Sequence, residues 1–301
     1  MNRGDETKRA PDFLIVGAQK CGTTSLHRHL AAHPDIYMPG AKELEFFSSD
    51  ERFERGLDWY LDTYFEAGRS AAVRGEASTH YMMRVPEVPE RIHDTLPDVK
   101  LIAILRNPIE RAYSHFRMSV MRGQESREFE EAIEACLALP EDAPPDVQHD
   151  YVRFGEYGRI LGAYLDRFPA SRIHVVLTED LARAPAETVA GVYRYLGVDP
   201  TYRPDTLEKR FNVGGEARFP GAMEQLRRTV GRARRIPGVG ELLTQERYEA
   251  FKFWTRTELG IASKEDRGPS DVVRRRLARH YRPDVARLER ELDVQVSWPE
   301  V

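Results

Sequence analysis

The stretch DFLIVGAQKCGTTSL, residues 12–26, constrains the fold of this chain more than any other. Its apolar part, Phe13 to Val16, is typical of a short strand that is buried on both faces. Gly17 and Gly22 bound a tight loop, and the spacing of the leucines that follow predicts a helix beginning near Thr23. Backbone N–H groups and the helix dipole would both face this loop, so the segment predicts a binding site for an anion.

The order of residues within the loop separates two kinds of anion site. A nucleoside-triphosphatase loop has its lysine after the second glycine and a hydroxyl that holds Mg²⁺. Here Lys20 comes before Gly22, and a threonine takes the usual place of the lysine. The loop and the start of the helix supply these candidate binding residues: Lys20, Cys21, Gly22, Thr23, Thr24 and Ser25.

A second candidate anion site follows the apolar run Val99 to Leu105, which predicts another buried strand. Arg106 comes directly after this run, and Asn107-Pro108 ends the strand before a helix that begins near Ile109. A guanidinium group can bind a phosphate through two hydrogen bonds, and Ser114 on the helix could reach the same anion. Two anion sites at neighbouring strand ends suit a nucleotide with phosphate at both its 3′ and 5′ ends.

These segments resemble the 5′-phosphosulfate loop and the 3′-phosphate site of sulfotransferases that use 3′-phosphoadenylyl sulfate (PAPS). The resemblance is to the heparan sulfate branch and its bacterial relatives, and it extends over nearly the whole chain. Residues 42–47 resemble the K-E-x-x-F-F element, residues 172–181 the third strand, and residues 275–298 the C-terminal helix. Residues 211–220 resemble, more loosely, the glycine loop that closes over the nucleotide. This resemblance implies that Gly215 and Arg218 bind the nucleotide in this chain.

The resemblance also implies roles in catalysis. It places Lys20 at the leaving oxygen and makes Glu43 the general base, with Lys42 and His80 on the acceptor side. Glu45 and His80 are alternative bases, and the residues alone do not rank them. PAPS is then the donor, adenosine 3′,5′-diphosphate (PAP) the product, and no metal takes part. The acceptor is expected to be a hydroxyl or amine of a small molecule, sugar or lipid.

The chain departs from the family pattern at two positions near these residues. The lysine of G-E-K-S-P-x-Y is replaced by Ala77, so one positive charge is missing on the acceptor side. The histidine of K-E-x-H-F-F is replaced by Glu45. The missing charge at Ala77 argues against a strongly anionic glycan as the acceptor, and the modest net charge agrees.

Alternating strands and helices predict an α/β fold, a P-loop-like three-layer sandwich with a central parallel sheet and helices on both faces. The expected strands include residues 99–105 and 172–180, the latter ending in carboxylates, and the expected helices include residues 56–65, 88–96 and 157–168. Residues 1–10 are expected to form a disordered tail, and residues 11–301 a single sulfotransferase domain. Residues 124–150 are expected to be a variable insertion.

Composition limits the function classes further. The 301 residues carry a formal net charge of −4, which argues against a general nucleic-acid coat. No apolar run is long enough to predict a membrane span. Two cysteines, Cys21 and Cys136, fit a reducing cytoplasm, although Cys21 could also be a reactive thiol. Two alternatives remain: a P-loop nucleotide kinase, and a non-catalytic protein that binds nucleotides or polyanions. The sequence does not specify the oligomeric state.

Overall fold

The computed structural model describes residues 9–122, 124–140, 142–207 and 268–301. A five-stranded sheet with the strand order β2-β3-β1-β4-β5 lies at its centre, and all of its neighbouring strands are parallel. The strands are β1 Phe13–Gly17, β2 Ile36–Tyr37, β3 Val73–Ala77, β4 Lys100–Leu105 and β5 Ile173–Leu177. The predicted parallel sheet is therefore confirmed.

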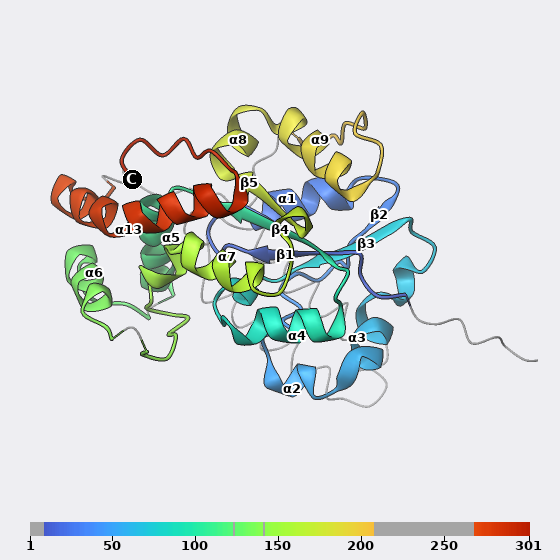
Figure 1. The fold of residues 1–301 in the computed structure, drawn as a ribbon, viewed down its shortest axis with the longest axis horizontal. Helices are drawn as coiled ribbons and strands as arrows, with labels where there is room; N and C mark the ends of the chain where they lie inside the picture. Colours follow the sequence, from blue (N-terminus) through green and yellow to red (C-terminus); the bar gives the residue numbers. More distant parts are fainter. Residues whose placement is uncertain (1–8, 123, 141, 208–267) are drawn as a thin grey trace, which may run out of the picture.

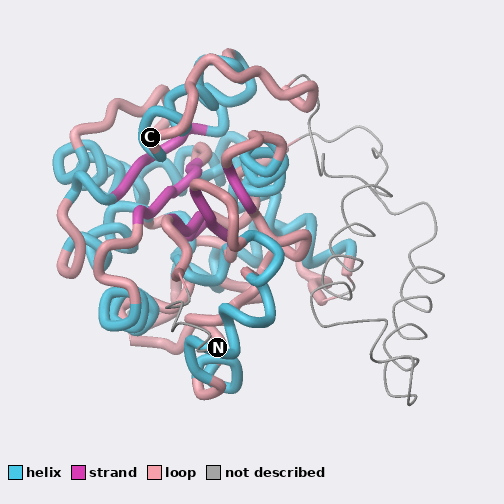
Figure 2. The backbone as a smooth tube through the Cα atoms, turned by 90° about the vertical axis from the view of Figure 1, so that its right-hand side faces the viewer, coloured by secondary structure: helices cyan, strands magenta, loops and turns pink. Residues whose placement is uncertain are grey.

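Helices cover the sheet on both of its faces. Figure 1 shows α1, α8 and α9 above the strands and α2, α3 and α4 below them, and Figure 2 shows the strands enclosed by helices in a view turned by 90°. The described α-helices are α1 Thr23–Ala31, α2 Asp50–Phe53, α3 Gly56–Tyr64, α4 Glu87–Thr95, α5 Pro108–Met121, α6 Phe129–Leu137, α7 Tyr157–Leu165, α8 Thr178–Arg183, α9 Pro185–Leu196 and α13 Asp271–Leu292. The three-layer α/β architecture is confirmed as well.

Strand β1 lies in the middle of the sheet and fixes the position of the loop that follows it. All five of its residues are buried, as expected for a parallel strand covered on both faces. It packs closely against β3: a side chain at Gly75 would come within 2.4 Å of the ring of Phe13. Glycine at this position lets the Phe13 ring lie directly against the backbone of β3.

Two local predictions differ from the structure. Residues 178–180 do not continue β5 but begin α8, with Glu179 and Asp180 in its first turn, where negative charge is favoured by the helix dipole. Strand β2 was not expected, because two residues carry no recognisable periodicity. It pairs with β3 at the edge of the sheet.

The C-terminal helix α13 packs on α7 and joins it to the rest of the fold. The carboxylate of Asp284 accepts hydrogen bonds from the backbone N–H groups of Gly158 (2.8 Å) and Arg159 (2.7 Å), at the start of α7. These are N–H groups for which the helix itself has no acceptor. Beyond α13, Trp298 is buried with its ring centre 5.9 Å from that of Tyr157.

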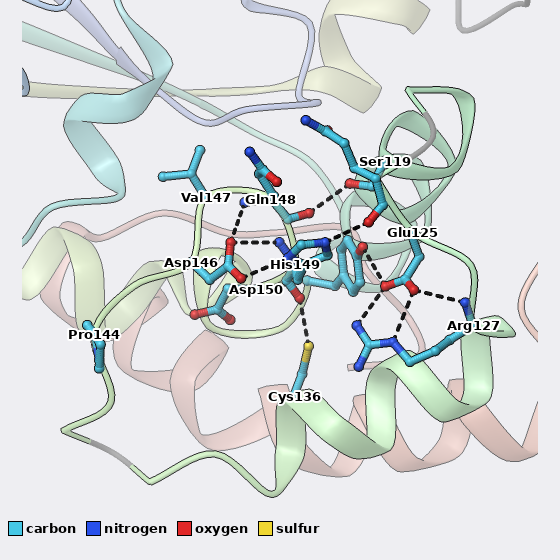
Figure 3. Close-up of polar contacts among 12 residues, drawn as sticks. Ser119, Glu125, Arg127, Cys136, Pro144, Asp146, Val147, Gln148, His149 and Asp150 are labelled. Atoms are coloured by element: carbon cyan, nitrogen blue, oxygen red, sulfur yellow. Dashed lines mark hydrogen bonds and ion pairs between the residues drawn. The ribbon is translucent and has the colours of Figure 1, made fainter.

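Within residues 124–150, the stretch expected to be an insertion, polar contacts connect α6 with its flanking loops, and the Ser119 hydroxyl of α5 donates to the carbonyl of Gln148 at 2.7 Å (Figure 3). His149 interacts with Asp146 at 2.8 Å and with the carbonyl of Gln124 at 2.8 Å, so both ring nitrogens have a partner. The Cys136 thiol donates to the carbonyl of His149 at 3.1 Å. The arrangement fastens the segment and leaves no ring nitrogen available for catalysis.

The expected N-terminal tail lies mostly outside the described residues. Arg9 is described, and it pairs with Asp12 at 2.7 Å. None of the helices in the described ranges has the length and apolar character needed to cross a bilayer.

Candidate active site

The loop between β1 and α1 lies at the carboxyl end of the central strand. Gly22 precedes α1 with a φ of 92°, a left-handed conformation that suits glycine. Lys20 adopts a φ of 72°, which is unusual for a residue with a side chain. The backbone N–H of Cys21 donates to the carbonyl of Ala18 at 3.2 Å and closes a turn within the loop. The first N–H groups of α1 follow this turn, as an anion site requires.

Residues Thr178 and Tyr157 connect this loop to the segment that carries Arg106. The Thr178 hydroxyl contacts the carbonyl of Cys21 and lies 2.8 Å from the carbonyl of Leu105. The Tyr157 hydroxyl donates to the carbonyl of Arg106 at 2.9 Å and lies 3.4 Å from the sulfur of Cys21. The two predicted anion-binding segments therefore form one connected structure at the ends of β1 and β4.

Positive charge is concentrated around this structure. The pKa of Lys20 is lowered to about 8, first by burial and then by neighbouring cations. These cations are Arg122, Arg106 and Arg111. Such repulsion favours binding of an anion, which would offset the charge.

Arg106 and Ser114 both lie at α5, Arg106 just before the helix and Ser114 half-buried within it. Arg106 also lies 3.5 Å from Glu110, and Glu110 lies 2.8 Å from Arg274 of α13. Arg106 is therefore part of an ion pair in this structure. The pair is half-exposed and loose, so exchange of Glu110 for a phosphate costs little.

The remaining loop residues divide into buried and half-buried groups. Thr23 and Thr24 are buried and Ser25 is half-buried. Cys21 is buried, and burial raises the pKa of its thiol to about 11. This thiol is protonated at neutral pH and is not a reactive nucleophile.

Glu43 lies in the segment that follows β2 and is held against the residues after β3. Its Oε2 accepts hydrogen bonds from the backbone N–H of Thr79 (2.7 Å) and from the Thr79 hydroxyl (3.0 Å). Its Oε1 contacts the ammonium group of Lys42. Burial alone would raise the pKa of Glu43, but Lys42 and the other partners lower it below its ordinary value. The carboxylate is therefore ionised at neutral pH, as a base must be.

Glu45 and His80 form a second pair beside Glu43. His80 Nδ1 lies 2.9 Å from Glu45 Oε1, and both side chains are about 30% exposed (28% and 30%). Burial lowers the pKa of His80, and the contact with Glu45 raises it above its ordinary value. The sequence had singled out both residues as alternative bases, but it gave no sign that they pair.

The backbone is strained at these candidate residues. Glu43 has a φ of 61° and Glu45 a φ of 54°, and Lys20 shares this left-handed conformation. Non-glycine residues rarely adopt this conformation, and those that do often lie at functional sites. Three of the four such residues in the described ranges are thus residues to which the sequence assigned chemistry.

A buried carboxylate that the sequence did not reveal as a site residue lies close to the pair of Glu45 and His80. Glu76 is fully buried and accepts hydrogen bonds from the hydroxyl groups of Tyr81 (2.5 Å), Ser78 (2.8 Å) and Tyr60 (3.3 Å). Ser78 in turn accepts a hydrogen bond from the backbone N–H of Glu45 at 2.9 Å. The G-E pair at the end of β3 was a signal for this residue, but it did not reveal the tyrosines.

Two further predictions concern residues outside the described ranges. Gly215 and Arg218, expected in the loop over the nucleotide, both lie there.

Among the described residues, no group of three or more side chains is arranged to hold a metal ion.

Comparison with known proteins bears on this geometry directly. The model of the sulfotransferase domain matches residues 10–212 of the chain. The chain belongs to the sulfotransferase domain family. The match includes both anion-binding segments and the segment of Glu43 and Glu45.

Relatives of this sulfotransferase-family chain are named as heparan sulfate sulfotransferases. The human heparan sulfate glucosamine 3-O-sulfotransferase 6 is 34% identical over 218 residues, which cover 72% of this chain and 60% of that protein. The human bifunctional heparan sulfate N-deacetylase/N-sulfotransferase 2 is 31% identical over 203 residues, which cover 64% of this chain and 22% of that protein. The chain thus spans at most about 60% of the length of these two relatives.

A solved structure supports the fold over almost the entire chain. The sulfotransferase from Alicyclobacillus acidocaldarius has a TM-score of 0.67 and 28% sequence identity, and the match covers 97% of this chain and 99% of that one. The α/β fold of the described residues is therefore that of a sulfotransferase.

Proposed function

We propose that this chain transfers a sulfuryl group from PAPS to a hydroxyl or amine of a small molecule, carbohydrate or lipid. The observation that carries the proposal is the connection between the loop of Lys20 and the segment of Arg106 through Tyr157. Because the two segments are held together, one ligand with anionic groups at both ends can bind to both. PAPS has this property, with a phosphosulfate at its 5′ end and a phosphate at its 3′ end.

In this proposal each end of the donor has its own partners. The phosphosulfate binds to the N–H groups after Gly22 and to Lys20, with the hydroxyl groups of Thr23, Thr24 and Ser25 as further donors. The 3′-phosphate binds to Arg106 and Ser114. Gly215 and Arg218 complete the nucleotide site in the resembling family, and we carry them over as part of the proposal.

The transfer step needs a base, a path in line with the bond that breaks, and charge on the leaving oxygen. The acceptor oxygen or nitrogen forms a bond to sulfur as the bond from sulfur to the bridging oxygen breaks. Glu43 takes the proton from the acceptor, and the ammonium group of Lys20 stabilises the negative charge on the oxygen that leaves with PAP. The N–H and hydroxyl of Thr79 hold the carboxylate of Glu43 in place.

Lys42 and His80 belong to the acceptor side of the proposal. The half-exposed pair of Glu45 and His80 offers hydrogen-bonding groups beside Glu43. Ala77 has no charge to offer at the position where the resembling family has lysine, so an uncharged or weakly charged acceptor fits better than a highly sulfated glycan. We also place the reaction in the cytoplasm, where thiols such as the free Cys21 and Cys136 stay reduced.

The test is a screen of candidate acceptors with PAPS labelled in its sulfuryl group, in the presence of excess EDTA. We expect label in an acceptor and release of PAP, because Lys20 and the loop N–H groups do the work that Mg²⁺ does in kinases. In a parallel assay with ATP and without EDTA, transfer of phosphate that requires Mg²⁺ would instead identify a kinase. Donor binding without turnover of any acceptor would favour a non-catalytic binding protein.

A further inference from the structure

Arg111, on the first turns of α5, is a buried cation that the proposed mechanism does not use. Its side chain is fully buried. One nitrogen, Nη2, donates to the carbonyl of Tyr151 at 2.5 Å. Its Nε and Nη1 have no hydrogen-bond partner among the residues that the structure describes. The chain thus satisfies only part of the guanidinium group.

No carboxylate in the described ranges forms an ion pair with Arg111. Arg153 shows the ordinary arrangement of a largely buried arginine in this fold: it lies 2.5 Å from the buried carboxylate of Asp150. The two arginines therefore differ in whether the protein itself offsets their charge. A buried charge without a partner is costly, because it has lost its hydration and gained nothing in return.

The surroundings of Arg111 place its charge near the proposed donor site. The backbone N–H of Arg111 donates to the carbonyl of Asn107 at 2.9 Å, so Arg111 lies one helical turn after the residue that follows Arg106. Its positive charge is one of the causes that lower the pKa of Lys20, and it opposes the burial that raises the pKa of the Cys21 thiol and of the Tyr157 hydroxyl. These are the residues of the anion-binding loop and of the link to Arg106. The position of Arg111 is itself fixed, because Tyr151 donates through its hydroxyl to Glu125 at 3.0 Å, a carboxylate that Figure 3 shows in contact with Arg127.

Lysine and arginine respond differently to such a positive environment. Lys20 can lose its proton, and its lowered pKa shows that it does so more easily than usual. Arginine keeps its proton at any pH that a folded protein survives. The charge of Arg111 can therefore be offset only by an anion.

We propose that Arg111 is a binding residue of the donor site, a buried permanent cation whose charge is offset by the anionic groups of the bound nucleotide. This inference rests on the proposed function, since it takes the ligand to be a nucleotide with a 3′-phosphate and a 5′-phosphate or phosphosulfate. Inside the protein, where water screens little, such a charge acts on an anion more strongly than a surface arginine does.

The proposal predicts a particular combination of effects. Without ligand, the protein carries the cost of an unpaired buried charge, and Arg111→Met removes that cost while it keeps the length of the side chain. With ligand, the same substitution removes a favourable interaction. Arg111→Met should therefore melt at the same temperature as the wild type or higher, and PAP should stabilise it much less.

The experiment measures melting temperature with and without PAP, and the Kd for PAP by titration calorimetry, for the wild type and three variants. For Arg111→Met we expect a Kd for PAP that is about tenfold higher or more. Arg111→Lys can carry the same charge but can also lose its proton, so it should recover most of the affinity at pH 6 and lose it again as the pH rises. Arg153→Met is the matched control: it leaves Asp150 buried without its partner, so it should lower the melting temperature and leave the shift caused by PAP unchanged.

Several outcomes would overturn the inference. It is wrong if Arg111→Met melts lower than the wild type but keeps the full stabilisation by PAP, or if it fails to fold while Arg153→Met folds. It is also wrong if Arg111→Lys binds PAP at pH 6 as poorly as Arg111→Met. If the wild type binds PAP no better than AMP, the proposed function itself fails, and this result does not depend on any Arg111 variant.

Discussion

The hydroxyl of Tyr157 donates a hydrogen bond to the backbone carbonyl of Arg106 at 2.9 Å. Tyr157 lies at the start of α7 and is fully buried, and its hydroxyl also lies 3.4 Å from the sulfur of Cys21. One side chain thus connects the segments that we propose to bind the two ends of the donor. We therefore expect the geometry of the proposed donor site to depend on it.

We predict that Tyr157→Phe weakens PAP binding although Tyr157 need not touch the nucleotide. The loss of the hydroxyl should cost about 1 kcal/mol of stability, as for a typical buried hydrogen bond. Because both anion-binding segments are loosened, affinity for PAP should fall as well. Tyr164→Phe is a matched control, since the buried Tyr164 hydroxyl donates to the carbonyl of Tyr81 at 2.9 Å, away from these segments. Both variants should lose similar stability in thermal melts, and only Tyr157→Phe should lose affinity for PAP. If the two variants bind PAP with equal affinity, the prediction is wrong.

Binding of PAP should weaken as the pH rises through about 8. The pKa of Lys20 is lowered to about 8 by burial and by Arg122, Arg106 and Arg111. A bound anion favours the charged form of Lys20, so binding above this pH requires uptake of a proton. Calorimetry between pH 7 and 9, in buffers with different heats of ionisation, measures both the affinity and the protons taken up. Lys20→Arg stays charged and should show a flat profile; a flat profile in the wild type would count against the assignment of Lys20.

The buried Glu76 should make the protein less stable as the pH rises. Burial raises the pKa of Glu76 to about 7 from an ordinary value of 4.5, against the opposing effect of its hydrogen bonds. The folded protein therefore holds a proton that the unfolded chain releases, so stability is full below about pH 4.5 and falls as the pH rises through about 7. The effect is on the order of 1 to 3 kcal/mol, at about 1.4 kcal/mol for each pH unit. Glu76→Gln should flatten the profile in melts from pH 5 to 8 and be the more stable form at pH 8; a variant that is less stable at pH 8 would refute this.

Substitution of the proposed base should separate chemistry from donor binding. Glu43→Gln keeps the size of the side chain and removes its basicity, so single-turnover rates should fall by roughly 10²–10⁴ with almost unchanged affinity for PAP. Glu45→Gln and His80→Asn each break the contact between Glu45 and His80, so these two variants should resemble each other and lose much less activity. Near-normal chemistry in Glu43→Gln together with failure of either other variant would transfer the role of base to that pair.

The sequence predicted the parts of the fold and the site that are encoded locally. The strands β1 and β4 are short apolar runs, and their burial on both faces follows from composition alone. The loop of Lys20 and the position of Arg106 after β4 could be predicted for the same reason. The helix dipole explains why Thr178, Glu179 and Asp180 turn into α8 where a longer strand was expected.

The contacts that complete the site could not be predicted, because they join residues far apart in the sequence. Glu45 and His80 carry no pattern that indicates their pairing. Tyr157 is one of two tyrosines in its helix, and nothing in its neighbours reveals the contact with Arg106. Arg111 has the spacing of a residue on a helix face, and only the packing of α5 against Tyr151 makes it a buried cation.

The central claim is that the site binds a nucleotide at both its 3′ and 5′ ends, and titration calorimetry with PAP, AMP and ATP tests it most directly. PAP should bind far more tightly than AMP or ATP, and Arg106→Ala should cost about 2–4 kcal/mol of PAP binding, as expected for loss of a charge-assisted contact with two hydrogen bonds. Binding of AMP should be almost unaffected by the same substitution. Equal affinity of the wild type for PAP and AMP would contradict a 3′-phosphate site at Arg106 and Ser114, and with it the proposed donor.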